Sequence, residues 1–214
     1  MWALATPVLA AGRRLGLVDL TAEDFEAAAV RLETVSEACR PDREAFVNPA
    51  KQLALELAGS LPMVWGAGTT GPVAAYRFGC QLAENAKYPA SVGVLPEAHH
   101  NQVVAFDGTL AGASADDDLF RDRVDGDEPV RLRLVIAHDD EGSESVSARV
   151  AVSEQIAHDR GVPVTTLRSE GGGPLERLAS LVGLIDYATV YLALVLGIDP
   201  TPVAPIDALK QRLA

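Results

Sequence analysis

The residues best suited to acid–base chemistry lie close together in the first half of the chain. They are the ionisable side chains of LAENAKYPASVGVLPEAHHN: Glu84, Lys87, Glu97, His99 and His100. Glu84 falls near the end of a predicted helix, where the helix dipole disfavours a carboxylate. If the side chain is also half-buried, its pKa rises toward the range useful to a general base. The alternative is an exposed glutamate paired with Lys87, worth roughly 0.2–0.5 kcal/mol.

The adjacent histidines, His99 and His100, offer an acid or a metal ligand. Neighbouring side chains cannot share one helix face, so we expect at most one of them to point into a site. A zinc site needs further His or Cys at set spacing, and His138 and His158 are too scattered to supply it. No metal site is therefore predicted, and a surface pair without a role remains the alternative.

A glycine-rich turn, GAGTTG, spans Gly66–Gly71. The preceding residues 61–65 are short and apolar and predict a buried strand, and Pro72 suits the first position of a following helix. The turn matches the dinucleotide-binding fingerprint G-x-G-x-x-G, with Glu97 as the acidic residue after the second strand, although the spacing is longer than usual. A tight turn without a ligand is the alternative.

The elements that must position these residues alternate between strands and helices. Strands are predicted at 61–65, 90–95, 130–137 and 163–167, and helices at 73–86, 145–158 and 175–196. This alternation predicts an α/β fold with a parallel sheet covered on both faces, and a loop could hide a fifth strand. Ligands bind beyond the carboxyl ends of such strands. Glu97 to Asn101 directly follow the predicted strand at 90–95, so we expect them to lie where a ligand would bind.

The N-terminal region is predicted to be helical and to contribute no strand. Helices are expected at 2–15, at 21–39 behind an approximate capping box from Thr21 and Asp24, and at 49–59 behind an Asn48 cap. The apolar first helix suggests that it packs on something else. We therefore divide the chain into a helical segment, 1–48, and an α/β domain, 49–214.

Two further segments follow from local composition. Residues 107–127 are rich in Asp, Gly, Ala and Ser and are predicted to form an exposed loop. The chain ends with a rigid connector at 199–202 and a short helix at 203–213 that carries Lys210.

Composition and charge exclude several classes of partner. A net charge of −12 argues against nucleic acids and anionic membrane surfaces. No apolar run reaches the ~18 residues of a membrane helix, because Asp186 interrupts the closest one. The first residues carry their basic side chains after the apolar run, unlike a signal peptide. Cys39 and Cys80 are far apart in sequence and are predicted to be free thiols of a cytoplasmic protein.

Taken together, these pieces resemble the second sugar isomerase (SIS) domain of the bifunctional phosphoglucose/phosphomannose isomerase family. The resemblance is carried by LPMVWGAGTTG, QLAENAKYPA, PEAHHNQVVAF and PTPVAPIDALKQRL, across residues 61–214. The order ENAKxPA, PExxHN, IDxLK is specific in combination, although no single piece is. The resemblance implies an SIS-type three-layer α/β/α sandwich with a mostly parallel sheet, preceded by a helical segment, and a homodimer.

The resemblance also implies a role for each candidate residue. Glu84 falls where the family has the base that moves a proton between C1 and C2 of the open-chain sugar. His100 falls on the ring-opening histidine, which reaches the site from the neighbouring subunit, and Lys210 on a terminal-helix lysine that contacts substrate and assists ring opening. The implied reaction is an aldose–ketose isomerisation of a sugar phosphate through a cis-enediol, with no cofactor and no metal. We assign substrate binding to Gly66, Gly68, Thr69, Thr70 and Asn101.

One departure from the family pattern concerns the phosphate. The family has two SIS domains, and the first supplies a Ser/Thr-rich phosphate cradle that we do not find here. The chain therefore resembles the C-terminal part of a longer enzyme, or a shortened relative. Thr69 and Thr70 are poor substitutes for the cradle, and Val203 replaces a usually polar residue, which leaves glucose or mannose preference open. A non-catalytic sugar-phosphate-binding module and a dinucleotide-binding domain remain the alternatives.

Overall fold

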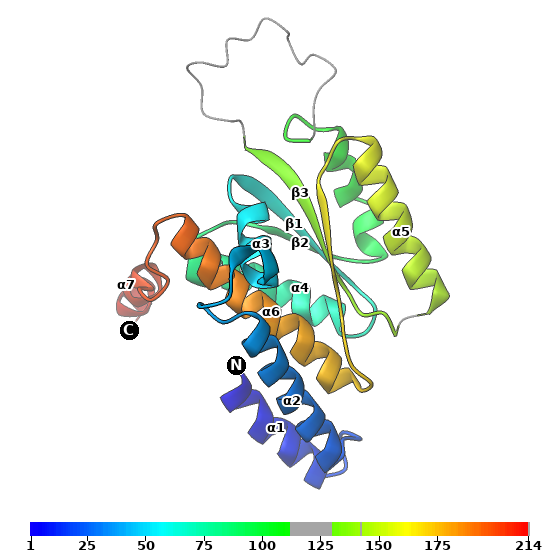
Figure 1. Ribbon diagram of the computed structural model, residues 1–214, viewed down its shortest axis with the longest axis vertical. Coiled ribbons are helices and arrows are strands. Elements are labelled where there is room, and N and C mark those ends of the chain that lie inside the picture. The colour runs from blue at the N-terminus through cyan, green and yellow to red at the C-terminus, as the bar shows by residue number, and fades with distance from the viewer. Residues whose placement is uncertain (112–129, 142, 214) are drawn as a thin grey trace, which may run out of the picture.

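The computed structural model describes residues 1–111, 130–141 and 143–213. A parallel sheet of four strands lies at its centre, in the order β2-β1-β3-β4 (Figure 1). The strands are β1 (Ser60–Ala67), β2 (Ser91–Val94), β3 (Arg131–His138) and β4 (Val164–Arg168). All neighbouring pairs are parallel, and Gly66 pairs with both Val94 and Ala137, so the strands end at one common edge.

Helices cover both faces of this sheet, which confirms the predicted three-layer α/β architecture (Figure 1). One layer comprises α3 (Pro49–Leu57), α4 (Gly71–Ala86) and α6 (Pro174–Val195), and the other contains α5 (Glu144–Asp159). Val64 and Val135 pack toward α4 and α6, whereas their neighbours Trp65 and Ile136 pack toward α5. Alternate side chains of a strand point to opposite faces, so residues 62–67 of β1 and 134–137 of β3, which are buried on both faces, are all apolar.

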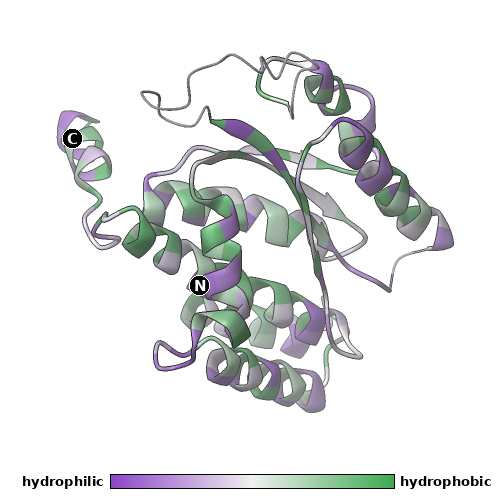
Figure 2. Cartoon of the chain, turned by 45° about the horizontal axis from the view of Figure 1, so that its top comes forward, coloured by the Kyte–Doolittle hydropathy of each residue, from purple (hydrophilic) through white to green (hydrophobic). Residues whose placement is uncertain are grey.

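The two helical layers differ in hydropathy. Figure 2 shows hydrophobic residues predominating around α6, whereas α5 alternates between hydrophobic and hydrophilic residues. Helix α6 has the length and composition of a membrane span, but 61% of its most apolar window is buried inside the protein. Its Asp186 accepts two hydrogen bonds from Arg77 of α4, at 2.9 and 2.7 Å. Helix α6 is thus the buried core helix that its sequence predicted.

The N-terminal helices are α1 (Trp2–Arg14) and α2 (Ala22–Ala38). The predicted capping box is confirmed, since Thr21 and Asp24 each bond the other's backbone N–H. Helix α2 packs against α6, and the Tyr191 hydroxyl of α6 donates to the Cys39 carbonyl oxygen at 2.5 Å. Helix α1 has no buried residue.

The remaining elements are short. The described residues contain three 3₁₀ turns, η1 (Ala45–Val47), η2 (Glu97–His99) and η3 (Gln102–Asp107). Ala98 of η2 and Phe106 of η3 join the core on the α5 face of the sheet. The segment after β2, which carries His99, His100 and Asn101, thus forms two 3₁₀ turns and no α-helix. Helix α7 (Ala204–Leu213) has no buried residue and stands away from the body (Figure 1). Most of the loop predicted at 107–127 lies outside the described residues.

Candidate active site

The glycines of the GAGTTG turn are required by the turn itself. A Cβ on Gly66 would lie 2.4 Å from the backbone at the start of α4, and one on Gly71 would lie 2.3 Å from a carbonyl oxygen at the end of β3. Gly68 has a φ of +80°, which favours glycine. Close backbone packing is thus enough to account for the three glycines of the fingerprint match.

A buried carboxylate, which no motif in the sequence indicated, holds this turn in place. Asp139 follows β3, is fully buried, and accepts hydrogen bonds from Thr70 N and Thr70 Oγ1, both at 2.9 Å. Arg177 Nε lies 2.8 Å from Asp139 Oδ1. The two side chains form an ion pair, but the N–H does not point at the oxygen closely enough for a hydrogen bond. Burial acts to raise the pKa of Asp139, but the Thr70 hydrogen bonds and the Arg177 charge outweigh it and lower that pKa.

The two adjacent histidines face different environments. His99 Nε2 lies 2.7 Å from Ser153 Oγ on α5, and the Ser153 hydroxyl donates to the Arg149 carbonyl, so the imidazole donates to Ser153. Burial lowers the pKa of His99, which also packs edge-on against Trp65. His99 thus serves packing, whereas His100 is exposed and available to a ligand or a second chain.

Glu84 is the one residue of the ENAK sequence whose side chain is not tied to another element. Its carboxylate is exposed and accepts only a 3.3 Å hydrogen bond from Gln81. Asn85 donates to Thr189 of α6 at 2.9 Å. Lys87 donates to the Glu84 backbone oxygen at 2.7 Å, so the alternative of a Glu84–Lys87 ion pair is not what the structure shows. The general-base argument required a half-buried carboxylate, but none of the residues that the structure describes covers the Glu84 side chain.

The predicted site residues divide between the two edges of the sheet. Helix α4 runs back along the sheet, so Glu84 lies about 21 Å from the glycine turn at 1.5 Å per residue. His100 and Asn101 follow β2 and lie on the same side as that turn. Lys210 belongs to α7, which leaves the body beside the far end of α4 (Figure 1). One chain therefore brings together the ends that carry Glu84 and Lys210, but places the other candidates at the opposite edge.

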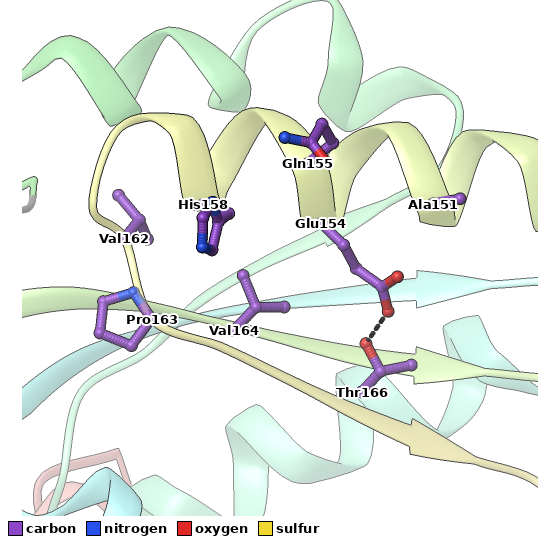
Figure 3. Close-up of a pocket in the computed structure, with 8 residues that line it drawn as sticks. All are labelled: Ala151, Glu154, Gln155, His158, Val162, Pro163, Val164 and Thr166. Atoms are coloured by element: carbon purple, nitrogen blue, oxygen red, sulfur yellow. Dashed lines mark hydrogen bonds between the residues drawn. The ribbon is translucent and has the colours of Figure 1, made fainter.

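A separate cavity of ≈ 510 Å³ lies between α5 and β4 (Figure 3). Glu154 of α5 crosses it to accept a hydrogen bond from Thr166 Oγ1 at 2.5 Å, and His158 lies on its rim. None of the predicted site residues lines this cavity. No group of three His, Cys, Asp or Glu within the described ranges is arranged to hold a metal ion.

Comparison with known proteins gives one family. Residues 46–213 match the model described as the bacterial phospho-glucose isomerase C-terminal SIS domain. The chain is 31% identical over 210 residues to the bifunctional phosphoglucose/phosphomannose isomerase of Caldicellulosiruptor bescii, covering 97% of this chain and 57% of that protein. The Aquifex aeolicus protein of the same name is 30% identical over 184 residues, which cover 85% of this chain and 51% of that protein. The chain thus spans about half the length of the curated relatives it matches.

Solved structures agree on the fold. A glucose-6-phosphate isomerase like protein from Thermus thermophilus superposes with a TM-score of 0.64 at 20% identity, over 89% of this chain and 56% of that one. The sugar isomerase domain of an RpiR transcription factor from Sphaerobacter thermophilus superposes with a TM-score of 0.53 at 11% identity, over 91% of this chain and 99% of that domain.

Proposed function

This chain belongs to the family of bacterial phosphoglucose isomerase C-terminal SIS domains, and from that premise we propose that it interconverts fructose 6-phosphate with glucose 6-phosphate or mannose 6-phosphate. The observation that carries the proposal is the far end of α4. There Glu84 is presented to solvent while its neighbours are fixed to other elements, and the helix with Lys210 departs from the same end. A carboxylate and an ammonium near one sugar are what proton transfer through an enediolate requires.

The third group of the proposed chemistry must come from a second copy of the chain. His100 lies beyond the carboxyl end of β2, at the edge opposite Glu84, and proton transfer needs groups within about 3 Å. We propose a homodimer in which His100 of one copy opens the sugar ring beside Glu84 of the other. The residues assigned to substrate binding in the turn, and Asn101, would enter the site with that His100.

Apolar surface on both segments supports this pairing. The outer face of α4 exposes Val73 (54%) and Tyr76 (70%) on the way to Glu84, and the segment around His100 exposes Val94 (41%) and Val104 (67%). Exposed apolar side chains next to a proposed site are typical of an interface. Pairing two copies by these surfaces would bury both and bring the acid, the imidazole and the amine together.

The phosphate is proposed to bind elsewhere than at the glycine turn. Arg177 and Arg168, beside that edge, already pair with Asp139 and Asp140, respectively. Thr70 uses its N–H and hydroxyl on Asp139, so it shapes the turn, whereas Thr69 is exposed. A further domain, for which the greater length of the relatives leaves room, is the natural source of phosphate donors.

We expect the protein in the cytoplasm, where free thiols persist.

Turnover of fructose 6-phosphate by the purified protein tests the proposal. Glu84→Gln is expected to abolish turnover, and Glu33→Gln, at an exposed helical glutamate of α2, to leave it unchanged. Binding of fructose 6-phosphate without turnover in any variant would instead support the non-catalytic module. Binding of NAD(H) would support the dinucleotide alternative.

Mixing two inactive variants tests the shared site. If Glu84→Gln and His100→Ala chains exchange subunits, each mixed dimer contains one intact site, and about a quarter of the wild-type activity returns. If both variants are inactive and no activity returns after subunit exchange, the shared site is wrong.

A further inference from the structure

Lys87 has a backbone conformation that its residue type does not favour. It ends α4 in the left-handed region, with φ 54° and ψ 33°, and is the only non-glycine residue with positive φ among those the structure describes. Glycine is the usual residue at this position after a helix, because it has no Cβ to clash. A lysine here suggests that the side chain has a task that glycine could not perform.

The side chain of Lys87 joins two segments that are 113 residues apart. Its Nζ donates to the Glu84 carbonyl oxygen at 2.7 Å and to the Pro200 carbonyl oxygen at 3.2 Å. Pro200 lies in the connector between α6 and α7, where Asp199 Oδ1 also accepts the Thr201 N–H at 2.9 Å. The ammonium group therefore ties the end of α4 to the root of α7.

The position of α7 depends on this connector, because α7 has no buried residue to hold it. A ten-residue helix without packing is marginal in water, and its direction is set by the backbone from which it departs. The connector has prolines at 200 and 202, each of which fixes one backbone angle. A single bond at its base can thus orient the whole arm.

We infer that Lys87 is a positioning residue that holds the α7 arm, and with it Lys210, beside the end of α4 that carries Glu84. The inference rests on the proposed function, since it gives Lys87 a part in the reaction only through Lys210. It assigns the three lysines of the chain distinct tasks. Lys51 ties the loop before α3 through Pro41 and Arg43, Lys87 fastens the arm, and Lys210 meets substrate.

Two substitutions separate this role from a simple helix cap. Lys87→Gly keeps and eases the left-handed backbone but removes the ammonium group, and kcat/KM is expected to fall roughly ten- to a hundredfold through misplacement of Lys210. Lys87→Arg keeps a donor for Pro200 and is expected to stay within about threefold of wild type. If Lys87 only capped α4, Lys87→Gly would be as active as wild type, which would overturn the inference. Lys51→Ala, which removes a comparable ammonium far from the site, is the matched control.

A double-mutant cycle tests whether the effect passes through Lys210. In a Lys210→Ala background, Lys87→Gly is expected to cause no further loss of kcat/KM, because the group that it positions is already gone. Additive losses would show that Lys87 acts on something else, and the inference would be wrong.

A measurement without substrate keeps the inference separate from the proposed function. A spin label on Leu209→Cys, in a Cys80→Ser background, reports the motion of α7. Lys87→Gly is expected to sharpen its spectrum, and neither Lys87→Arg nor Lys51→Ala to do so. An unchanged spectrum in Lys87→Gly refutes the clamp, whereas a sharpened spectrum in a protein without turnover refutes only the isomerase activity.

Discussion

Replacing Arg177 by methionine is expected to expose how strongly the fold depends on the Asp139–Arg177 pair. Methionine keeps an unbranched apolar stem and removes the charge. The Asp139 side chain is fully buried and that of Arg177 is 7% exposed, so the carboxylate would remain in the protein interior without its cation. Truncating one partner of a buried ion pair typically costs about 3–5 kcal/mol.

The structure places the expected loss at the lower end of that range. The Asp139 carboxylate also accepts hydrogen bonds from Thr70, from Ser169 Oγ and from the Glu141 N–H, and these remain in the variant. We therefore expect a loss of about 3 kcal/mol, which is roughly a hundredfold in the unfolding equilibrium constant.

Urea unfolding at pH 7 measures this loss, with Arg31→Met as the matched control. Arg177 pairs with the carboxylates of Asp139 and Glu141. Arg31 likewise pairs with two carboxylates, those of Glu170 and Glu176, but its side chain is 22% exposed, so we expect Arg31→Met to cost about 1 kcal/mol or less. If Arg177→Met loses no more than Arg31→Met, the buried pair does not stabilise the fold as argued.

The same variant is expected to change the acid sensitivity of the protein. The pKa of Asp139 is lowered in the folded state, from an ordinary value of 3.8, so its contribution is complete above pH 3.8 and is lost as the pH falls through the folded value. Without Arg177, burial has less opposition and the folded-state pKa of Asp139 rises toward its ordinary value. The difference between the folded and unfolded pKa values then shrinks, so the unfolding free energy of the variant falls less steeply below pH 3.8 than that of the wild type. An unfolding free energy with the same pH dependence in both proteins would contradict this account.

Three further outcomes are expected. Gly71→Ala, whose Cβ would lie 2.3 Å from a backbone oxygen of β3, will lower the urea midpoint sharply or prevent folding, whereas Gly172→Ala, with open space around it, will not; equal midpoints would contradict the packing. Burial lowers the pKa of His138 in the folded protein from its ordinary 6.5. As the pH drops below about 6.5, the unfolded chain therefore binds a proton at this site more readily than the folded chain, and the free energy of unfolding falls. His138→Gln should make the free energy of unfolding less dependent on pH in this range. Cys80, which is half-buried, should react with a thiol reagent in the native protein and the fully buried Cys39, whose pKa burial raises, only after unfolding; equal rates would argue against the packing of α2.

Much of the fold could be predicted because its signals are local. The alternation of apolar strands and amphipathic helices predicted the parallel sheet. The N-terminal caps of two helices could be predicted from one or two residues each. Asn48, for example, accepts the N–H groups of Ala50 and Lys51 as expected. The Glu84–Lys87 alternative failed because Lys87 leaves the helix and turns its side chain to carbonyl oxygens, which no i, i+3 spacing can indicate.

The parts of the site that could not be predicted depend on residues distant in sequence. Asp139 and Arg177 meet only because β3 ends beside the start of α6, and neither belongs to a motif. The His99–Ser153 contact similarly needs η2, which follows β2, to lie beside α5, which packs on β3 and β4. By contrast, the separation of Glu84 from the glycine turn was available from the sequence, since a helix that follows a strand of a parallel sheet must run back to its opposite edge.

That separation links the catalytic proposal to the assembly. A proton cannot pass between groups at opposite ends of a 16-residue helix, so Glu84 and His100 of one chain cannot act on one sugar. Lys87, by contrast, ties the two elements that carry Glu84 and Lys210 within one chain. On the proposed function, each chain would supply the ends that carry Glu84 and Lys210, and a second copy would supply His100, so we expect turnover only from the oligomer.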